Sequence, residues 1–193
     1  TGLHAKTGNY PGVTVSRSEG VARTHDHTFA IEDLPGTYSL SPISPDEQVV
    51  VDVLDGRMDQ VSAPDALVVV ADATALRRSL LLLAEVLPRH LPTAVVVTMT
   101  DELRRRQGFL DVTALSQALG VPVVAVVANR GIGIGELRNL LTTWHDWDRP
   151  PLDPPSRSSE LAGWVDSVLD TAGYEDPDPD SRTERIDKVL LHP

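Results

Sequence analysis

Cysteine is absent from the 193 residues, and long apolar runs are absent too. Without thiols, the sequence excludes disulfides, thiolate catalysis and cysteine zinc sites. The longest apolar runs, at residues 66–71 and 80–84, are far below the roughly 18 to 20 residues that a membrane-spanning helix needs. We therefore expect this stretch of chain to be soluble.

Aromatic residues and positive charge are also scarce. Aromatic side chains make up 4% of the chain, so aliphatic side chains must fill the core. The 17 Lys and Arg residues face 28 Asp and Glu residues, which gives a formal net charge of −11. This negative charge opposes non-specific binding to polyanions, and we expect no nucleic-acid partner. The 41% of apolar residues is nevertheless typical of a globular protein.

A strand-then-helix pattern repeats between residues 65 and 145. Short runs rich in valine predict the strands, and apolar residues at spacings of three and four predict the helices that follow. The predicted strands cover 65–71, 93–98 and 121–127, and the predicted helices lie near 76–87, 112–119 and 134–144. Continuous apolar strands indicate burial on both faces, which predicts an α/β fold with a doubly wound, mostly parallel sheet.

The two ends of the chain have different patterns. Two strands near 13–21 and 28–31 predict a hairpin at one edge of the sheet, and a helix begins at Pro45 and ends near Gly56. A proline-rich stretch at 148–155 marks a domain boundary. We predict one domain over 1–149 and a small helical domain over 150–193, with helices near 161–169 and 182–191.

Two segments carry candidate chemistry on the phosphate side of a ligand. A strand delivers Asp33 to the end of the sheet, where its carboxylate could bind Mg²⁺, and the backbone N–H of Gly36 could meet a terminal phosphate. Upstream, the glycine-rich loop at 8–15 contains Gly12 and offers the Thr14 hydroxyl to the same metal. Asp and Gly are common turn residues, so an ordinary turn is the alternative at 33–36.

Two further segments follow buried strands and suit a nucleotide base. Asp101 comes after the strand at 93–98, where its carboxylate could accept two N–H bonds from a guanine edge. Ala128, Asn129 and Arg130 come after the strand at 121–127, in a loop whose amides could meet the base carbonyl. Ligands of open α/β sheets bind at these strand ends.

The loop at 8–15, the Asp-Leu-Pro-Gly-Thr-Tyr-Ser-Leu stretch at 33–40 and the acidic pair Asp46 and Glu47 resemble the cytosolic GTPase domain of the ferrous iron transport protein B family. The resemblance covers nearly the whole chain, and 150–190 is similar to the family's helical domain. Residues 185–193 resemble the stretch before its first membrane helix.

This resemblance implies GTP or GDP and Mg²⁺ as ligands, with Thr14 and Asp33 at the metal and Thr14 and Gly36 at the catalytic centre. Gly12 and Thr14 would belong to the first switch, which γ-phosphate contacts order and hydrolysis releases. Asp101, Thr98 and the loop at 128–130 would bind guanine. The implied partners are guanine nucleotide, the transmembrane part of the same transporter and a second copy of the chain, at the cytoplasmic face of the bacterial inner membrane.

The sequence departs from the family at three places. No Gly-x-x-x-x-Gly-Lys-Ser/Thr phosphate loop occurs, so the chain is either a piece of a longer protein or a relative that lacks the loop. Thr98 replaces the asparagine of the guanine motif, which predicts weaker guanine binding. Thr37 follows Gly36 in place of a Gln or His, so we expect slow hydrolysis.

Two other functions stay open at this point. One is a nucleotide-independent interaction module that keeps the fold, and the other is a bacterial GTPase of ribosome or tRNA biology. A metal site at His25 and His27 and an iron-collecting run at 175–180 are weaker alternatives to a solvated hairpin and an acidic linker.

Overall fold

A three-stranded parallel sheet forms the centre of the protein. The computed structural model describes residues 6–24, 27–150 and 152–179. Strands β4 (Leu67–Asp72), β5 (Thr93–Thr98) and β6 (Val123–Ala125) pair in parallel in the order β4-β5-β6. All three predicted strands are confirmed, although β6 is shorter than its apolar run suggested.

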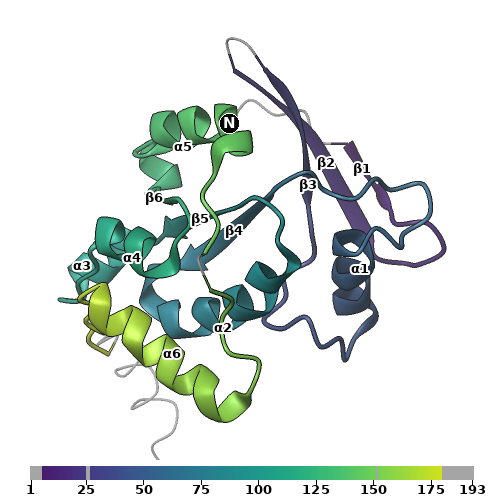
Figure 1. The fold of residues 1–193 in the computed structure, drawn as a ribbon. Coiled ribbons are helices and arrows are strands. Elements are labelled where there is room, and N and C mark those ends of the chain that lie inside the picture. Colours follow the sequence, from purple (N-terminus) through teal and green to yellow (C-terminus); the bar gives the residue numbers. More distant parts are fainter. Residues whose placement is uncertain (1–5, 25–26, 151, 180–193) are drawn as a thin grey trace, which may run out of the picture.

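Helices alternate with these strands, and among the α-helices the short one at Thr100–Arg105 was not predicted from the sequence. They are α2 (Leu76–Val86), α3 (Thr100–Arg105), α4 (Val112–Leu119), α5 (Ile134–Thr142) and α6 (Ser158–Thr171), with 3₁₀ turns η1 (Ala73–Ala75), η2 (Leu87–Arg89), η3 (Ala128–Arg130) and η4 (Trp144–Asp146). Local signals fix their ends: Asp111 caps α4 by accepting from two backbone N–H groups, and Gly120 ends it at φ 66°. Figure 1 shows α6 packed along α2 and α4, and the apolar faces of these three helices share one core with β4 and β5.

The first third of the chain forms a second sheet. Strands β1 (Lys6–Asn9), β2 (Ser16–Arg23) and β3 (Thr28–Asp33) pair antiparallel in the order β1-β2-β3. Helix α1 (Pro45–Leu54) begins in a capping box made by Ser44 and Glu47. Its apolar residues divide between the core of the parallel sheet and a smaller core that contains Tyr10 and Val15, so α1 joins the two halves.

The two sheets are separate, whereas the sequence predicted that the hairpin would extend the edge of one sheet. Across Figure 1 the strands follow the order β6, β5, β4, β3, β2, β1, so β3 and β4 are the inner edges, and neither has a second strand partner among the described residues. On β4, Val69 is buried but Val68 and Val70 are 41% and 64% exposed. The expected burial on both faces is therefore wrong for β4, because no described element covers the second face.

The C-terminal part of the described chain packs on this core. Val165, Val168 and Leu169 of α6 are buried among residues of α2 and α4. The division into domains at residues 149 and 150 stays a prediction, and the helix predicted over 182–191 lies outside the described residues. Among the described residues, none of the helices combines the length and apolar character that crossing a bilayer requires.

Candidate functional site

The carboxylate predicted to bind guanine lies beside the loop predicted to support the base. Asp101 is in the first turn of α3, directly after β5, and Met99 makes the connection in a left-handed conformation at φ 59°. Arg130 Nη2 lies 3.7 Å from Asp101 Oδ2, and both side chains are solvent-accessible, at 63% and 31%. The structure therefore brings the segments after β5 and β6 together, as their shared sheet edge predicted.

The loop after β6 is folded tightly onto its own strand. Val127 N–H donates to Ile132 O at 3.0 Å, and Ile132 N–H donates to Val127 O at 3.3 Å. Gly133 has φ 77°, and a Cβ built on it would lie 2.0 Å from Ala125 O. Only glycine allows this approach. The close return presents the exposed residues 128–130 at the end of the sheet.

Thr98 links the ends of two parallel strands. Its Oγ1 donates to Ala71 O at 3.2 Å, so a hydroxyl at the end of β5 reaches the backbone of β4. An asparagine amide would offer two donors and an acceptor from this position, whereas the threonine offers one short hydroxyl. The predicted weaker support of the guanine loops stays a prediction.

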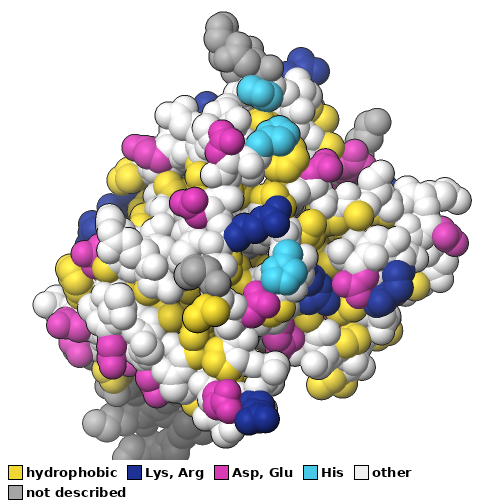
Figure 2. Space-filling model, viewed as in Figure 1, with side chains coloured by type: hydrophobic (Ala, Val, Ile, Leu, Met, Phe, Trp, Pro, Cys, Tyr) yellow, Lys and Arg dark blue, Asp and Glu magenta, His cyan; other side chains and the backbone are white. Residues whose placement is uncertain are grey.

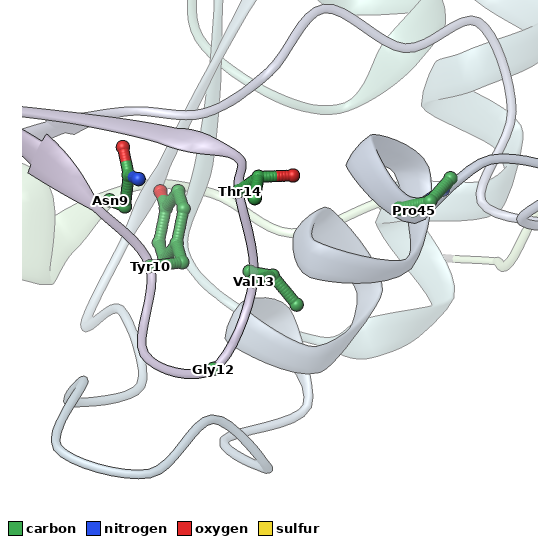
Figure 3. Close-up of a pocket in the computed structure, with 6 residues that line it drawn as sticks. All are labelled: Asn9, Tyr10, Gly12, Val13, Thr14 and Pro45. Atoms are coloured by element: carbon green, nitrogen blue, oxygen red, sulfur yellow. The ribbon is translucent and has the colours of Figure 1, made fainter.

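The glycine-rich loop is a tight hairpin tip between β1 and β2. Tyr10 N–H donates to Val15 O at 2.9 Å, and Val13 N–H donates to Tyr10 O at 3.3 Å, across Pro11 and Gly12. Pro followed by a glycine at φ 78° is typical of a type II turn. Figure 3 shows Thr14 on the arm that faces α1, the helix that Pro45 begins, with Gly12 at the tip. These residues line an open pocket of about 600 Å³.

Tyr10 anchors this hairpin. Its side chain is 1% exposed and packs in the small core under α1, while the Arg17 guanidinium lies 5.9 Å from its ring. Arg17 also donates to both carboxylate oxygens of Glu32, at 3.0 and 3.2 Å. Burial, and then the nearby Glu32 carboxylate, raise the pKa of Tyr10 above its ordinary value. The phenol Oη has no hydrogen-bond partner among the described residues.

The segment at 33–36 leaves the end of β3 in an exposed position. Asp33 pairs with Ser18 in the sheet, and both Asp33 and Gly36 are exposed. Nothing in the described chain lies within 4 Å of a Cβ built on Gly36, and its φ is not in the left-handed region. The protein itself therefore does not require glycine there, and the space around the Gly36 backbone is open.

The predicted residues form three groups rather than one cavity. Gly12 and Thr14 line the hairpin pocket, Asp33 and Gly36 lie after β3, and Asp101 lies with the loop at 128–130. Within 6–24, 27–150 and 152–179, no hydrogen bond or ion pair joins one group to another, and all three lie where strands end.

The two remaining metal candidates, at His25 and His27 and in the acidic run at 175–180, gain no support. His25 lies outside the described residues, His27 is exposed, and the described ranges contain no group of three His, Asp or Glu residues placed to hold a metal ion. On the face that Figure 2 shows, basic side chains are scattered among acidic ones.

Comparison with known proteins gives one family. The family described as ferrous iron transport protein B matches residues 1–141. The chain belongs to the ferrous iron transport protein B family. A relative from Salmonella choleraesuis, the Fe(2+) transporter FeoB, is 42% identical over 179 residues, which cover 90% of this chain and 21% of that protein. The chain spans about a fifth of the length of the curated relatives it matches.

Solved structures of this family share the fold. The cytosolic domain of L. pneumophila FeoB aligns with a TM-score of 0.70 at 29% identity, covering 91% of this chain and 74% of that one. The GDP form II of the cytosolic domain of the T. maritima FeoB iron transporter aligns with a TM-score of 0.69 at 28% identity, covering 99% and 84%. The α/β class is confirmed, and family membership sets aside the GTPase of ribosome or tRNA biology.

Proposed function

We propose that the chain is a guanine-nucleotide-binding switch, the GTPase-type regulatory domain of a ferrous iron transporter. The observation that carries the proposal is the 3.7 Å approach of Arg130 to Asp101. It supports the proposal because the carboxylate that would accept from guanine lies close to a residue of the loop whose amides would meet the base carbonyl. A related structure is described as a GDP form of a FeoB cytosolic domain.

Thr14 and Asp33 are the residues that would hold Mg²⁺. Both offer hard oxygen donors, both are exposed, and neither side chain has a hydrogen-bond partner within the described residues. Bound Mg²⁺ would neutralise charge on the β- and γ-phosphates. The open space at Gly36 lets a phosphate oxygen approach its backbone N–H closely. In this proposal Thr14 and Gly36 contribute to catalysis by sensing and positioning the terminal phosphate.

Hydrolysis would be slow because Thr37, and not a Gln or His, follows Gly36. Thr37 Oγ1 donates to Ser39 O, so its hydroxyl is engaged with its own backbone turn. Hydrolysis would then depend on the metal, on positioning of the reacting groups and on backbone N–H donors.

The inner strand edges indicate how the phosphate site would be completed. A strand inserted between β3 and β4 would pair both open edges, and an element following it would cover Val68 and Val70. A phosphate loop carried by that strand would lie between the hairpin at Thr14 and the segment at Gly36. A chain that bound no nucleotide even with such a loop would instead be a nucleotide-independent interaction module.

The relatives are named as Fe(2+) transporters, and this chain matches about a fifth of their length. We infer that nucleotide state, sensed by the loop at Thr14 and the segment at 33–36, biases the transmembrane part of the same transporter, at the cytoplasmic face of the inner membrane. Assembly of copies through that part is compatible with this arrangement.

Calorimetric titration with GDP and with ATP, each with Mg²⁺, tests the proposal. We expect GDP to bind and ATP not to bind, and Asp101→Ala to weaken GDP by about 10- to 100-fold, as expected for lost bonds to a charged acceptor. Asp170→Ala, at an exposed position of α6, is the matched control and should not change affinity.

The same titration repeated with a relative's strand and phosphate loop joined ahead of residue 1 separates the alternatives. GDP binding by either form supports the switch. No GDP binding by either form contradicts it and supports the nucleotide-independent module.

A further inference from the structure

One carboxylate of α2 holds the segment that follows Gly36. Glu85 accepts a hydrogen bond from Leu40 N–H, and its two carboxylate oxygens each lie 3.1 Å from Ser39 Oγ. Ser39 Oγ in turn accepts from Ser41 N–H at 3.0 Å. Glu85 is separated from this segment by about 45 residues of chain, so the contact is tertiary and fixes the segment against the helix.

A second side chain of the same helix face contacts the same segment. The Arg78 guanidinium lies 5.0 Å from the centre of the Tyr38 ring, and Arg78 is two helical turns before Glu85. Leu40 is 8% exposed and packs in the main core. The segment is therefore held at three points, which are the Tyr38 ring, the Glu85 carboxylate and the Leu40 side chain.

The link continues back to Gly36 through Thr37. Ser39 N–H donates to Thr37 Oγ1 at 3.3 Å, and Thr37 Oγ1 donates to Ser39 O. Residue 37 is therefore tied to residue 39, which is tied to Glu85. Gly36 directly precedes this turn. These bonds therefore set the direction of the backbone at Gly36.

We propose that Glu85 is a positioning residue for the γ-phosphate site: by holding residues 39 and 40 it sets where the Gly36 backbone N–H points. The inference rests on the proposed nucleotide function, since Gly36 is the group that would meet the terminal phosphate. GDP lacks that phosphate, so the role of Glu85 should be visible with a triphosphate analogue and not with GDP.

Hydrogen exchange measured by NMR on the 193-residue chain tests whether Glu85 holds the segment. Glu85→Ala should raise the exchange rate of the Leu40 amide at least tenfold and leave the amides of β5 unchanged. Glu85→Gln should show a smaller rise, because its amide oxygen still accepts from Leu40 N–H. Arg77→Ala is the control, since Arg77 is on the same helix but pairs with Asp166 of α6 at 2.7 Å.

An unchanged Leu40 rate in Glu85→Ala overturns the inference, and so does a uniform rise at all amides, which would indicate general loss of stability. Titration with GDP and GMPPNP then tests the link to phosphate. We expect Glu85→Ala to weaken GMPPNP about tenfold, the loss of one bond to a charged group, and to change GDP less than twofold.

Equal weakening of both nucleotides, or no change in either, overturns the positioning role. Wild-type protein that binds neither nucleotide, with or without the added phosphate loop, refutes the proposed function and the phosphate role together. The exchange measurement separates the two failures, because it reports on Glu85 and the segment without any nucleotide.

Discussion

Replacing Gly133 with alanine should damage the loop after β6 far more than the same change at Gly131. Both glycines have left-handed backbones, with φ 77° and 70°. An alanine at either position therefore costs roughly 1–2 kcal/mol for its backbone conformation. At Gly131 nothing lies within 4 Å of the new Cβ, so this should be the whole cost.

At Gly133 the new Cβ would also lie 2.0 Å from Ala125 O and 3.0 Å from the carbonyl carbon. These are backbone atoms of β6, which cannot rotate away as a flexible side chain can. The strand or the loop must therefore shift by more than an ångström, and overpacking of this kind costs about 1–3 kcal/mol. We expect Gly133→Ala to lose that amount of unfolding free energy in addition to the Gly131→Ala loss.

Urea denaturation followed by circular dichroism measures both variants, because the change in midpoint reports stability when the slope is unchanged. Equal losses in the two variants would refute the argument, since they share the conformational cost and differ only in the close contact. A Gly131→Ala loss that exceeds the Gly133→Ala loss would refute it as well.

Three further predictions concern Tyr10, Arg130 and Tyr174, a tyrosine that packs against the main core. Tyr10→Phe removes a buried hydroxyl that has no hydrogen-bond partner among the described residues. The unfolding free energy should therefore stay the same or rise by up to about 1 kcal/mol. A clear loss of unfolding free energy in urea denaturation would contradict this. Arg130→Ala removes a cation that competes for Asp101, so GDP binding should tighten by a few-fold, up to about 1 kcal/mol. Weaker GDP binding in calorimetry would mean instead that Arg130 contacts the base. Burial, and then Asp176, raise the pKa of Tyr174 to about 12, so its neutral form stabilises the fold. That contribution is complete below pH 10 and is lost as the pH rises towards 12, and Tyr174→Phe should flatten this part of the stability profile.

The parallel half of the fold could be predicted because its signals are local. Valine-rich runs and helical spacings mark β4, β5 and the helices between them, and Pro45 with its acidic neighbours marks the start of α1. Strand β1 has a polar four-residue sequence with no alternation, and it is a strand because β2 pairs with it. Its conformation is a tertiary effect that local pattern does not encode.

In the candidate site, too, the features that depend on local sequence could be predicted and the tertiary contacts could not. The strand-end positions of Asp33 and Asp101 followed from the order of strands along the chain. The contact of Glu85 with Ser39 did not, because it joins segments distant in sequence and nothing in a helical glutamate distinguishes it from its neighbours. The exposure of Val70 also escaped prediction, since burial of a strand face depends on which other element covers it.

The edges of β3 and β4 that have no second strand partner in the described part of the chain also bear on how the protein behaves when concentrated. An unpaired strand with an exposed apolar face is a template for pairing with another molecule, so edge-to-edge aggregation competes with native pairing. Asp65 and Asp72 bracket the apolar run of β4, and charges in such flanking positions act as gatekeepers against this association. Neutralising both with asparagine should therefore lower the concentration at which light scattering appears, without changing any residue of the candidate site.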